Sequence, residues 1–394
     1  MPEAEGGAGA VFGQVVREVL SWALMRPGLS AKRLVVKVGS AVLTGERGLD
    51  LEAMAEIARQ VAALREEGRE VVLVSSGAVA AGMRRLGLKE RPKGMPKKQA
   101  LAALGQPLLM AFWQEAFAPF GLPVAQVLLT AEDLSSRSRY LNAKATLRAL
   151  LDLGAIPVIN ENDTVAFEEI RFGDNDQLSA RVAALVEAGL LALLSDVDAL
   201  YEEDPKKNPQ ARPIPEVESV EAVLAHAGEE NPLGSGGMKS KLLAARIAGR
   251  VGIPTLLLPG KRPGVLLQAL SGAPLGTYFH ARRRYRGEKA WLFGLLRPKG
   301  ELVLDRGAVR ALKERGASLL PAGVKEVRGR FSRGEAVRLL SEEGEEVGVG
   351  LANYASEEIA RIKGRRSAEI EAVLGYRYTE EVVHRDHLAL KEEA

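Results

Sequence analysis

The chain has 394 residues and a formal net charge of +3, with 46% hydrophobic and 27% charged residues, as in an ordinary globular protein with room for two domains. Cysteine is absent and only four histidines occur, which excludes disulfides, thiolate nucleophiles and cysteine-based metal sites and fits a cytoplasmic protein. The small charge gives no overall indication of a nucleic-acid partner, and without a run of about 18 apolar residues we expect no membrane partner.

Residues 1–31 are expected to form an N-terminal extension. Their apolar stretch, residues 11–24, is interrupted by Arg17, Glu18 and Ser21, and no basic residue precedes it. A signal peptide has a basic start and an uninterrupted apolar core. We therefore predict either an amphipathic appendage or an upstream extension before a natural start at Met25, and in both cases no part in the chemistry.

The next 250 or so residues alternate between short apolar runs and segments with helical periodicity. Strands are predicted at residues 34–38, 71–74, 124–129, 156–160, 190–194 and 255–258. Helices are predicted at residues 51–67, 78–86, 99–117 and 138–153, with a last helix that opens at 234–241 and ends at Arg250. This alternation predicts an α/β fold, with an open, mostly parallel sheet and helices on both faces.

Polar and glycine residues follow four of these strands, at Gly39-Ser40, Ser75-Ser76-Gly77, Asn160 to Asp163 and Ser195-Asp196. Ligands of open parallel sheets lie beyond the carboxyl ends of the strands. A second polar cluster, Gly173 to Gln177, lies ten residues after the third of these groups. The two clusters are suited to hold a small polar ligand, a metal ion or the ends of lysine side chains.

Two lysines and one glycine-rich segment suggest phosphate chemistry. Lys37, inside the first strand, either lies on a half-exposed strand face or directs a cation at a phosphoryl group. Residues 234–241 form either a flexible linker or a turn whose N–H groups bind phosphate at a helix start, and they include Lys241. Two lysines brought together require an acid between them, and Asp176 is the candidate.

The character of the chain changes after residue 279. Residues 280–289 form a basic linker, more often a solvated linker than an RNA site. Short runs at residues 292–294, 301–304, 323–327, 336–340 and 347–351, with one helix at 308–315, predict a small β-rich domain at 290–366. Residues 367–394 form a tail with few signals.

With these motifs in order, residues 32–279 resemble the amino acid kinase family, and residues 285–365 resemble a PUA domain, which is known chiefly from RNA-modifying proteins. The motifs are Val36 to Ser40, Ser75 to Ala78, Asn160 to Asp163, Gly173 to Asp176 and Gly236 to Lys241. The pairing of these two domains is characteristic of family members that phosphorylate the γ-carboxylate of L-glutamate with ATP, the first step of proline biosynthesis.

The resemblance implies roles for individual residues. Lys37, Lys241 and Asp176 would be catalytic, with Asp176 orienting the two lysines. The residues implied in glutamate binding are Ser76, Gly77, Asp163 and Asn175. The residues implied in ATP binding are Lys37, Gly39, Ser195, Asp196, Ser235, Gly236, Gly237, Met238, Lys239, Ser240 and Lys241. The phosphates and water would supply most of the Mg²⁺ ligands, and no dedicated protein metal site is implied.

The resemblance also implies feedback inhibition by proline, a homodimer or homotetramer, and RNA binding through the PUA-like domain. Two alternatives stay open at this point. One is a kinase of the same fold that acts on another acid, such as aspartate or N-acetylglutamate. The other is an RNA-binding or RNA-modifying protein, which would show salt-dependent binding to tRNA.

Overall fold

The computed structural model describes residues 26–45, 48–90, 92–166, 175–205, 207–226, 236–281 and 298–391. The chain divides into two compact units, Met1–Arg284 and Tyr285–Ala394. The predicted extension at 1–31 and linker at 280–289 lie largely outside the described residues, so the domain boundaries stay a prediction.

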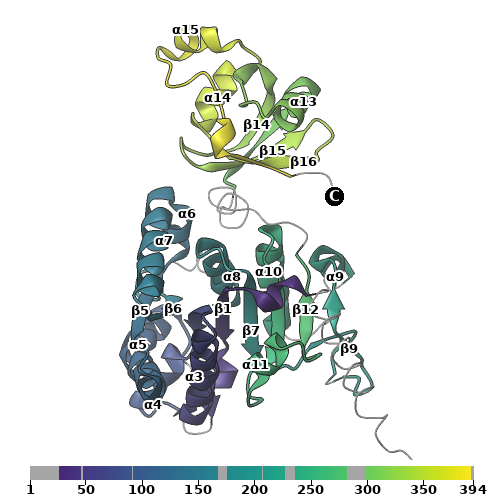
Figure 1. The fold of residues 1–394 in the computed structure, drawn as a ribbon. Helices are drawn as coiled ribbons and strands as arrows, with labels where there is room; N and C mark the ends of the chain where they lie inside the picture. The colour runs from purple at the N-terminus through teal and green to yellow at the C-terminus, as the bar shows by residue number, and fades with distance from the viewer. Residues whose placement is uncertain are drawn as a thin grey trace, which may run out of the picture. The chain divides into compact units, whose positions relative to one another are not determined.

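A single large sheet forms the centre of the first unit (Figure 1). Its strand order is β10-β12-β11-β7-β1-β4-β6-β5. Only β11 and β12 are antiparallel, and every other neighbouring pair in this sheet is parallel. The strands of the unit are β1 (Arg33–Val38), β2 (Thr44–Gly45), β3 (Gly48–Leu49), β4 (Glu70–Ser75), β5 (Val124–Leu129), β6 (Ile156–Glu161), β7 (Leu190–Ser195), β8 (Leu200–Tyr201), β9 (Pro213–Ile214), β10 (Glu216–Val217), β11 (Thr255–Pro259) and β12 (Thr277–Phe279).

Helices cover both faces of this sheet, which confirms the predicted fold class. The α-helices are α2 (Ser40–Leu43), α3 (Leu51–Glu66), α4 (Ala78–Arg85), α5 (Met95–Phe117), α6 (Ala131–Ser135), α7 (Arg137–Asp152), α8 (Asn175–Leu185), α9 (Val220–His226), α10 (Gly236–Arg250) and α11 (Val265–Leu270). Short 3₁₀ turns lie at η1 (Pro27–Ser30) and η2 (Ala118–Phe120). Asp50 begins α3 by accepting a hydrogen bond from the backbone N–H of Ala53 at 3.0 Å, as an N-cap residue does.

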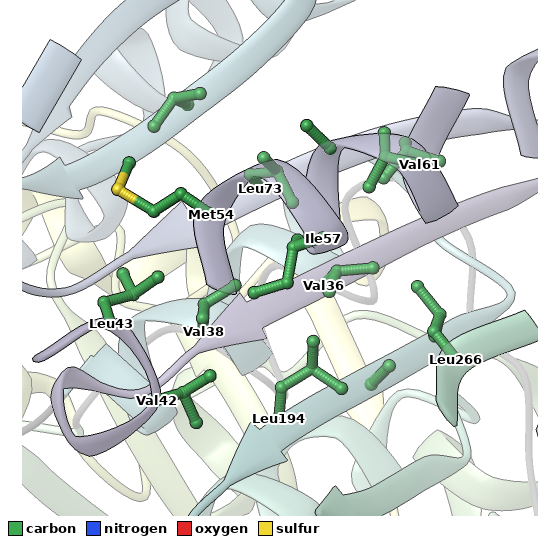
Figure 2. Close-up of a cluster of buried hydrophobic side chains, with 14 of the residues drawn as sticks. Val36, Val38, Val42, Leu43, Met54, Ile57, Val61, Leu73, Leu194 and Leu266 are labelled. Carbon is green, nitrogen blue, oxygen red and sulfur yellow. The ribbon is translucent and has the colours of Figure 1, made fainter. Parts of the chain in front are cut away.

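The two faces of β1 pack against different helices. Val36 and Val38 belong to one hydrophobic cluster with Ile57 and Val61 of α3, and Figure 2 shows these side chains together. Because successive side chains of a strand point to opposite faces, Lys37 must face the other way. That other face is covered by α8, which contacts β1 and α10. The hydrophobic pattern of β1 therefore places its one lysine between the sheet and these two helices.

Helices α4 and α5 approach each other unusually closely, and glycine makes this contact fit. A Cβ added at Gly105 would lie 1.7 Å from the carbonyl oxygen of Ala78, and one added at Gly82 would lie 2.0 Å from that of Leu101. Neither space admits a methyl group. The contact fixes α4 against α5. It also fixes Gly77, the N-cap residue of α4, whose φ of 110° favours glycine.

We expect Gly105→Ala to destabilise the first unit by about 3 kcal/mol, at the upper end of overpacking effects, because the new methyl group meets rigid backbone. The melting temperature should fall by roughly 6–12 °C. Thermal unfolding of the purified variant is the measurement. Gly45→Ala is the matched control, since a Cβ there meets nothing within 4 Å. Equal melting temperatures for the two variants would contradict the packing argument.

The predicted strands and helices of the first unit are confirmed, with ends that move by one or two residues in most cases. The largest difference is at α5, which was expected to begin at Gln99 and begins at Met95. Pro96 lay outside the predicted helix, yet it lies in the first helical turn, where its missing N–H has no helical partner to lose.

The second unit contains a five-stranded sheet with strand order β14-β13-β15-β16-β17. Its elements are β13 (Gly300–Leu304), α13 (Arg306–Arg315), η3 (Pro321–Gly323), β14 (Val324–Gly329), β15 (Ala336–Ser341), β16 (Glu346–Leu351), α14 (Ser356–Ile362), η4 (Ser367–Glu369), α15 (Ile370–Leu374), η5 (Arg385–His387) and β17 (Leu388–Leu390). The predicted run at 292–294 lies outside the described residues.

Residues 367–391, which the sequence pattern assigned to a tail, contribute to the core of the second unit. Ile370, Val382 and Val383 are fully buried there. Strand β17 pairs with β16, so the latter is not an exposed edge. A strand of three residues is too short to show periodicity, which is why this segment gave few sequence signals.

Within the described parts of the chain, no helix combines the length and the apolar character needed to cross a membrane.

Candidate functional site

The carboxyl ends of β7, β1 and β4 are tied together by backbone hydrogen bonds. The N–H of Gly39 donates to the carbonyl of Leu194 at 3.0 Å, and the N–H of Ser76 donates to that of Val38 at 3.1 Å. The N–H of Gly260 donates to the carbonyl of Ser195 at 2.7 Å. The predicted turns after β1, β4 and β7 therefore lie side by side at the carboxyl ends of the strands, where ligands of this architecture bind.

A buried carboxylate bridges the two predicted lysines on the α8 face of the sheet. Lys37 Nζ lies 2.6 Å from Asp176 Oδ1, and Lys241 Nζ lies 3.5 Å from Asp176 Oδ2. The three side chains come from β1, α8 and α10. Asp176 is fully buried, and Lys37 and Lys241 are 3% and 8% exposed. The sequence left open whether Lys37 lies on a half-exposed face, and its burial excludes that alternative.

This triad carries one net positive charge in a position largely removed from water. Asp176 alone would be an uncompensated buried anion, and the two lysines alone would repel each other. Lys241 Nζ also donates to the carbonyl of Gly237 at 3.2 Å, one turn earlier in α10. The bridge thus holds two ammonium groups near one another, and together they can bind an anion with more than one charge.

The carboxamide of Asn175, the first residue of α8, connects two of the predicted segments. Its Nδ2 lies 3.0 Å from Ser76 Oγ, 3.0 Å from Asn160 Oδ1 and 3.3 Å from the carbonyl oxygen of Ser75. No hydrogen bond to its Oδ1 comes from a described residue. Asn175 therefore has its donors occupied and an acceptor oxygen to offer.

Asp163 lies in the turn after β6 and is half-buried. Its carbonyl oxygen accepts from Gln99 Nε2 at 2.7 Å. Residues 167–174 lie outside the described chain, and they include Gly173 and Asp174 of the predicted motif. The structure thus brings Ser76 and Asn175 into contact and places Asp163 on the connection that leads from β6 towards Asn175.

The predicted nucleotide residues fall on two elements. Ser195 ends β7, and its Oγ donates to Oδ1 of the exposed Asp196 at 3.0 Å. Residues Gly236, Gly237, Met238, Lys239, Ser240 and Lys241 form the first turns of α10. Ser235 lies outside the described residues. No group of three or more His, Cys, Asp and Glu side chains suited to a metal ion occurs in the described chain.

A cavity of about 510 Å³ lies elsewhere, at the amino ends of β1, β7 and β11. Arg33, Glu70, Tyr278 and His280 are among the residues that line it. Burial raises the pKa of Tyr278 to about 12. None of the predicted site residues lines this cavity, so the cavity is separate from the strand-end site.

Three residues next to the site were not predicted from the sequence. They are Gln99, Gln106 and Trp113, all on α5, and each donates to or accepts from a strand-end segment. The sequence pattern marked α5 only as a long helix. Their spacing of seven residues, about two helical turns, places all three on one face of the helix and could have been noticed in the sequence.

Comparison with known proteins gives consistent matches along the chain. Residues 32–258 match the model of the amino acid kinase family, and residues 300–374 match that of the PUA domain. The chain is 62% identical to the glutamate 5-kinase of Meiothermus ruber, over 92% of this chain and 96% of that protein. It is 50% identical to the glutamate 5-kinase of Geobacter sulfurreducens, over 93% and 100%.

Among solved structures, an isopentenyl phosphate kinase matches with a TM-score of 0.46 at 17% identity, covering 63% of this chain and 99% of that one.

Proposed function

The chain belongs to the amino acid kinase family, and we propose that it transfers the γ-phosphoryl group of ATP to the γ-carboxylate of L-glutamate, which forms L-glutamyl 5-phosphate. The two curated relatives described above carry the name glutamate 5-kinase and align with nearly the whole chain. L-glutamyl 5-phosphate formation would make the protein the first enzyme of a route to proline.

The bridge of Lys37, Asp176 and Lys241 is the observation that carries this proposal. In phosphoryl transfer the protein contributes positioning and charge stabilisation more than covalent chemistry. Two ammonium groups held by one buried carboxylate, at 2.6 and 3.5 Å, are suited to the equatorial oxygens of a phosphoryl group in transit. Asp176 keeps the lysines in place before substrate arrives, so little reorganisation is needed during the reaction.

The acceptor needs no general base. A γ-carboxylate with an ordinary pKa of about 4.3 is already ionised at neutral pH. The main obstacle is repulsion between this carboxylate and the triphosphate, and lysines and N–H donors reduce it. A site without cysteine and without a histidine at the triad is consistent with this demand.

We assign the amino-acid end of glutamate to Ser76, Gly77, Asp163 and Asn175. Because three protein acceptors occupy Nδ2 of Asn175, its Oδ1 is the atom left for the substrate. A carbonyl oxygen can accept only from a donor, and the α-ammonium group of an amino acid is one. N-acetylation replaces that cation with a single amide N–H, so this contact favours the free amino acid.

ATP is assigned to Gly39, to Ser195 and Asp196 at the end of β7, and to the beginning of α10, whose N-terminal N–H groups favour phosphate. Both carboxylate oxygens of Asp176 face lysine ammonium groups, so Asp176 is not a ligand for a metal ion. The site therefore fits a Mg²⁺ ion that binds together with the ATP phosphates and keeps most of its water ligands. When bound, Mg²⁺ neutralises part of the phosphate charge.

The test is ATP consumption with L-glutamate, D-glutamate, L-aspartate and N-acetylglutamate in parallel. We expect kcat/KM for L-glutamate to exceed that for each of the other three at least about 100-fold, because each lacks the chain length, the chirality or the ammonium group. A preference for L-aspartate or N-acetylglutamate would overturn the substrate assignment and favour a same-fold kinase of another acid.

Further expectations follow from the family premise and stay predictions. They are feedback inhibition by proline, a homodimer or homotetramer, and a cytoplasmic location. RNA binding is a second candidate function, which the match of residues 300–374 to a PUA domain favours.

A further inference from the structure

One face of α5 carries three polar contacts to the substrate segments. The residues are Gln99, Gln106 and Trp113, and each is seven positions after the previous one. Seven residues are two turns of an α-helix to within about 20°, so the three side chains project from nearly one line. The helix therefore presents a polar row, Gln99–Gln106–Trp113, to the ends of β4 and β6.

Trp113 contacts the end of β4. Its indole N–H donates to Ser75 Oγ at 2.9 Å, and Ser75 Oγ donates to the carbonyl of Ser76 at 3.0 Å. Trp113 and Ser75 are both fully buried. An indole nitrogen can only donate, so this bond fixes the direction of the Ser75 hydroxyl. The carbonyl of the same Ser75 accepts from Asn175.

Gln106 contacts the end of β6. Its Oε1 accepts from Asn160 Nδ2 at 2.9 Å, and Asn160 Oδ1 accepts from Asn175 Nδ2 at 3.0 Å. Asn160 and Gln106 are 4% and 8% exposed. A chain of three carboxamides thus runs from the middle of α5 to the first residue of α8.

Two backbone groups fix the direction of this chain. Asn160 Oδ1 accepts from the N–H of Glu161 at 2.9 Å, and a backbone N–H can only donate. At the other end Asn175 Nδ2 faces the carbonyl of Ser75, which can only accept. These two main-chain contacts identify the oxygen and the nitrogen of the Asn160 and Asn175 amides, and Asn160 therefore turns its NH₂ group towards Gln106.

We propose that Gln106 and Trp113 are positioning residues for the amino-acid substrate. They hold Asn160 and Ser75, and through them the carboxamide of Asn175, so that Oδ1 of Asn175 faces the substrate. Neither residue touches the reacting atoms. This inference rests on the proposed function, since it concerns the amino-acid subsite and leaves the lysine bridge unaffected.

Loss of the Gln106 oxygen would leave a buried NH₂ group on Asn160 without an acceptor. Asn160 can then relieve the cost only by rotating, which turns its NH₂ group towards that of Asn175. The acceptor that faces the substrate is lost in a fraction of molecules. Because the lysines do not change, affinity for the amino acid should fall more than the rate of phosphoryl transfer.

Gln106→Met is the principal variant, because methionine has a similar volume and no acceptor oxygen. We expect KM for L-glutamate to rise about tenfold, which corresponds to about 1.4 kcal/mol, while KM for ATP and kcat stay within about threefold. Trp113→Phe keeps one aromatic ring and removes the N–H donor together with the five-membered ring of the indole, and it should change KM for L-glutamate in the same direction.

Two further variants separate positioning from general destabilisation. Gln106→Glu keeps an oxygen acceptor for Asn160 but adds a nearly buried charge, so its KM for L-glutamate should lie between those of wild type and Gln106→Met. Gln114→Met makes the same change at an exposed position of the same helix and should behave as wild type. Melting temperatures of all four variants are measured alongside.

An unchanged KM for L-glutamate in Gln106→Met and in Trp113→Phe would overturn the inference. Equal rises in KM for ATP and L-glutamate would also overturn it. If Gln106→Met does not fold, KM for L-glutamate in Trp113→Phe is the measurement that decides whether the inference holds. Failure of the proposed function itself is distinguishable, because wild-type protein would then not consume ATP with L-glutamate.

Discussion

Lys241→Ala is expected to reduce kcat for phosphoryl transfer about 1,000-fold or more. The loss of a single positioned donor lowers kcat by about 10²–10³, and cations that stabilise a transferring phosphoryl group contribute about 10³–10⁵. Steady-state assay of ATP consumption with saturating L-glutamate is the measurement.

The fold should survive this substitution. Asp176 keeps Lys37 as its partner at 2.6 Å, so no uncompensated buried carboxylate remains. We expect the circular dichroism spectrum of the variant to match that of wild type and its melting temperature to fall by only a few degrees. Lys32→Ala is the matched control. Lys32 is exposed and directly precedes β1, at the amino ends of the strands, whereas the site lies at their carboxyl ends. Turnover like that of wild type in Lys241→Ala would refute the assigned role.

Asp176→Asn is the second substitution with a large expected effect. Asparagine has nearly the same shape, so the change removes charge and little volume. Lys37 and Lys241 then face each other without the anion that holds them, and we expect kcat to fall about 100-fold. Breaking a buried ion pair destabilises by about 3–5 kcal/mol, so the melting temperature should fall by roughly 10 °C.

A double variant tests the cause of that instability. If repulsion between the lysines is responsible, Asp176→Asn combined with Lys241→Met should melt at a higher temperature than Asp176→Asn alone, without recovery of kcat. Strict additivity of the two single effects would indicate that the groups are not coupled. Asp152→Asn, at an exposed position at the end of α7, is the control for the loss of an acidic side chain.

The sequence predicted the fold class well, and with it the strand ends at which the candidate site residues lie, for a physical reason. Strands buried on both faces read as continuous apolar runs, and β7, which is buried along its whole length, is one of them. A polar residue directly after such a run is conspicuous, and the ends of parallel strands meet at one edge. The sequence therefore predicts that Ser76, Asn160 and Ser195 lie near one another.

Predictions failed where short-range signals were weak or ambiguous. The helix predicted to begin at Gln99 left Pro96 outside it, although the first turn of a helix accepts proline. The pairing of β17 with β16 depends on a partner strand about 40 residues away in the sequence, and no local pattern encodes it.

The sequence by itself determined that the first unit is an α/β domain, that Lys37 lies inside a strand, and that Asp176 belongs to a polar cluster at the start of a helix. These properties follow from hydrophobic periodicity, which is local. Only the tertiary structure decided that Asp176 bridges Lys37 and Lys241 at 2.6 and 3.5 Å. Contacts between residues 65 or more positions apart depend on how helices pack against the sheet, and the spacing of residues along the chain does not specify that packing.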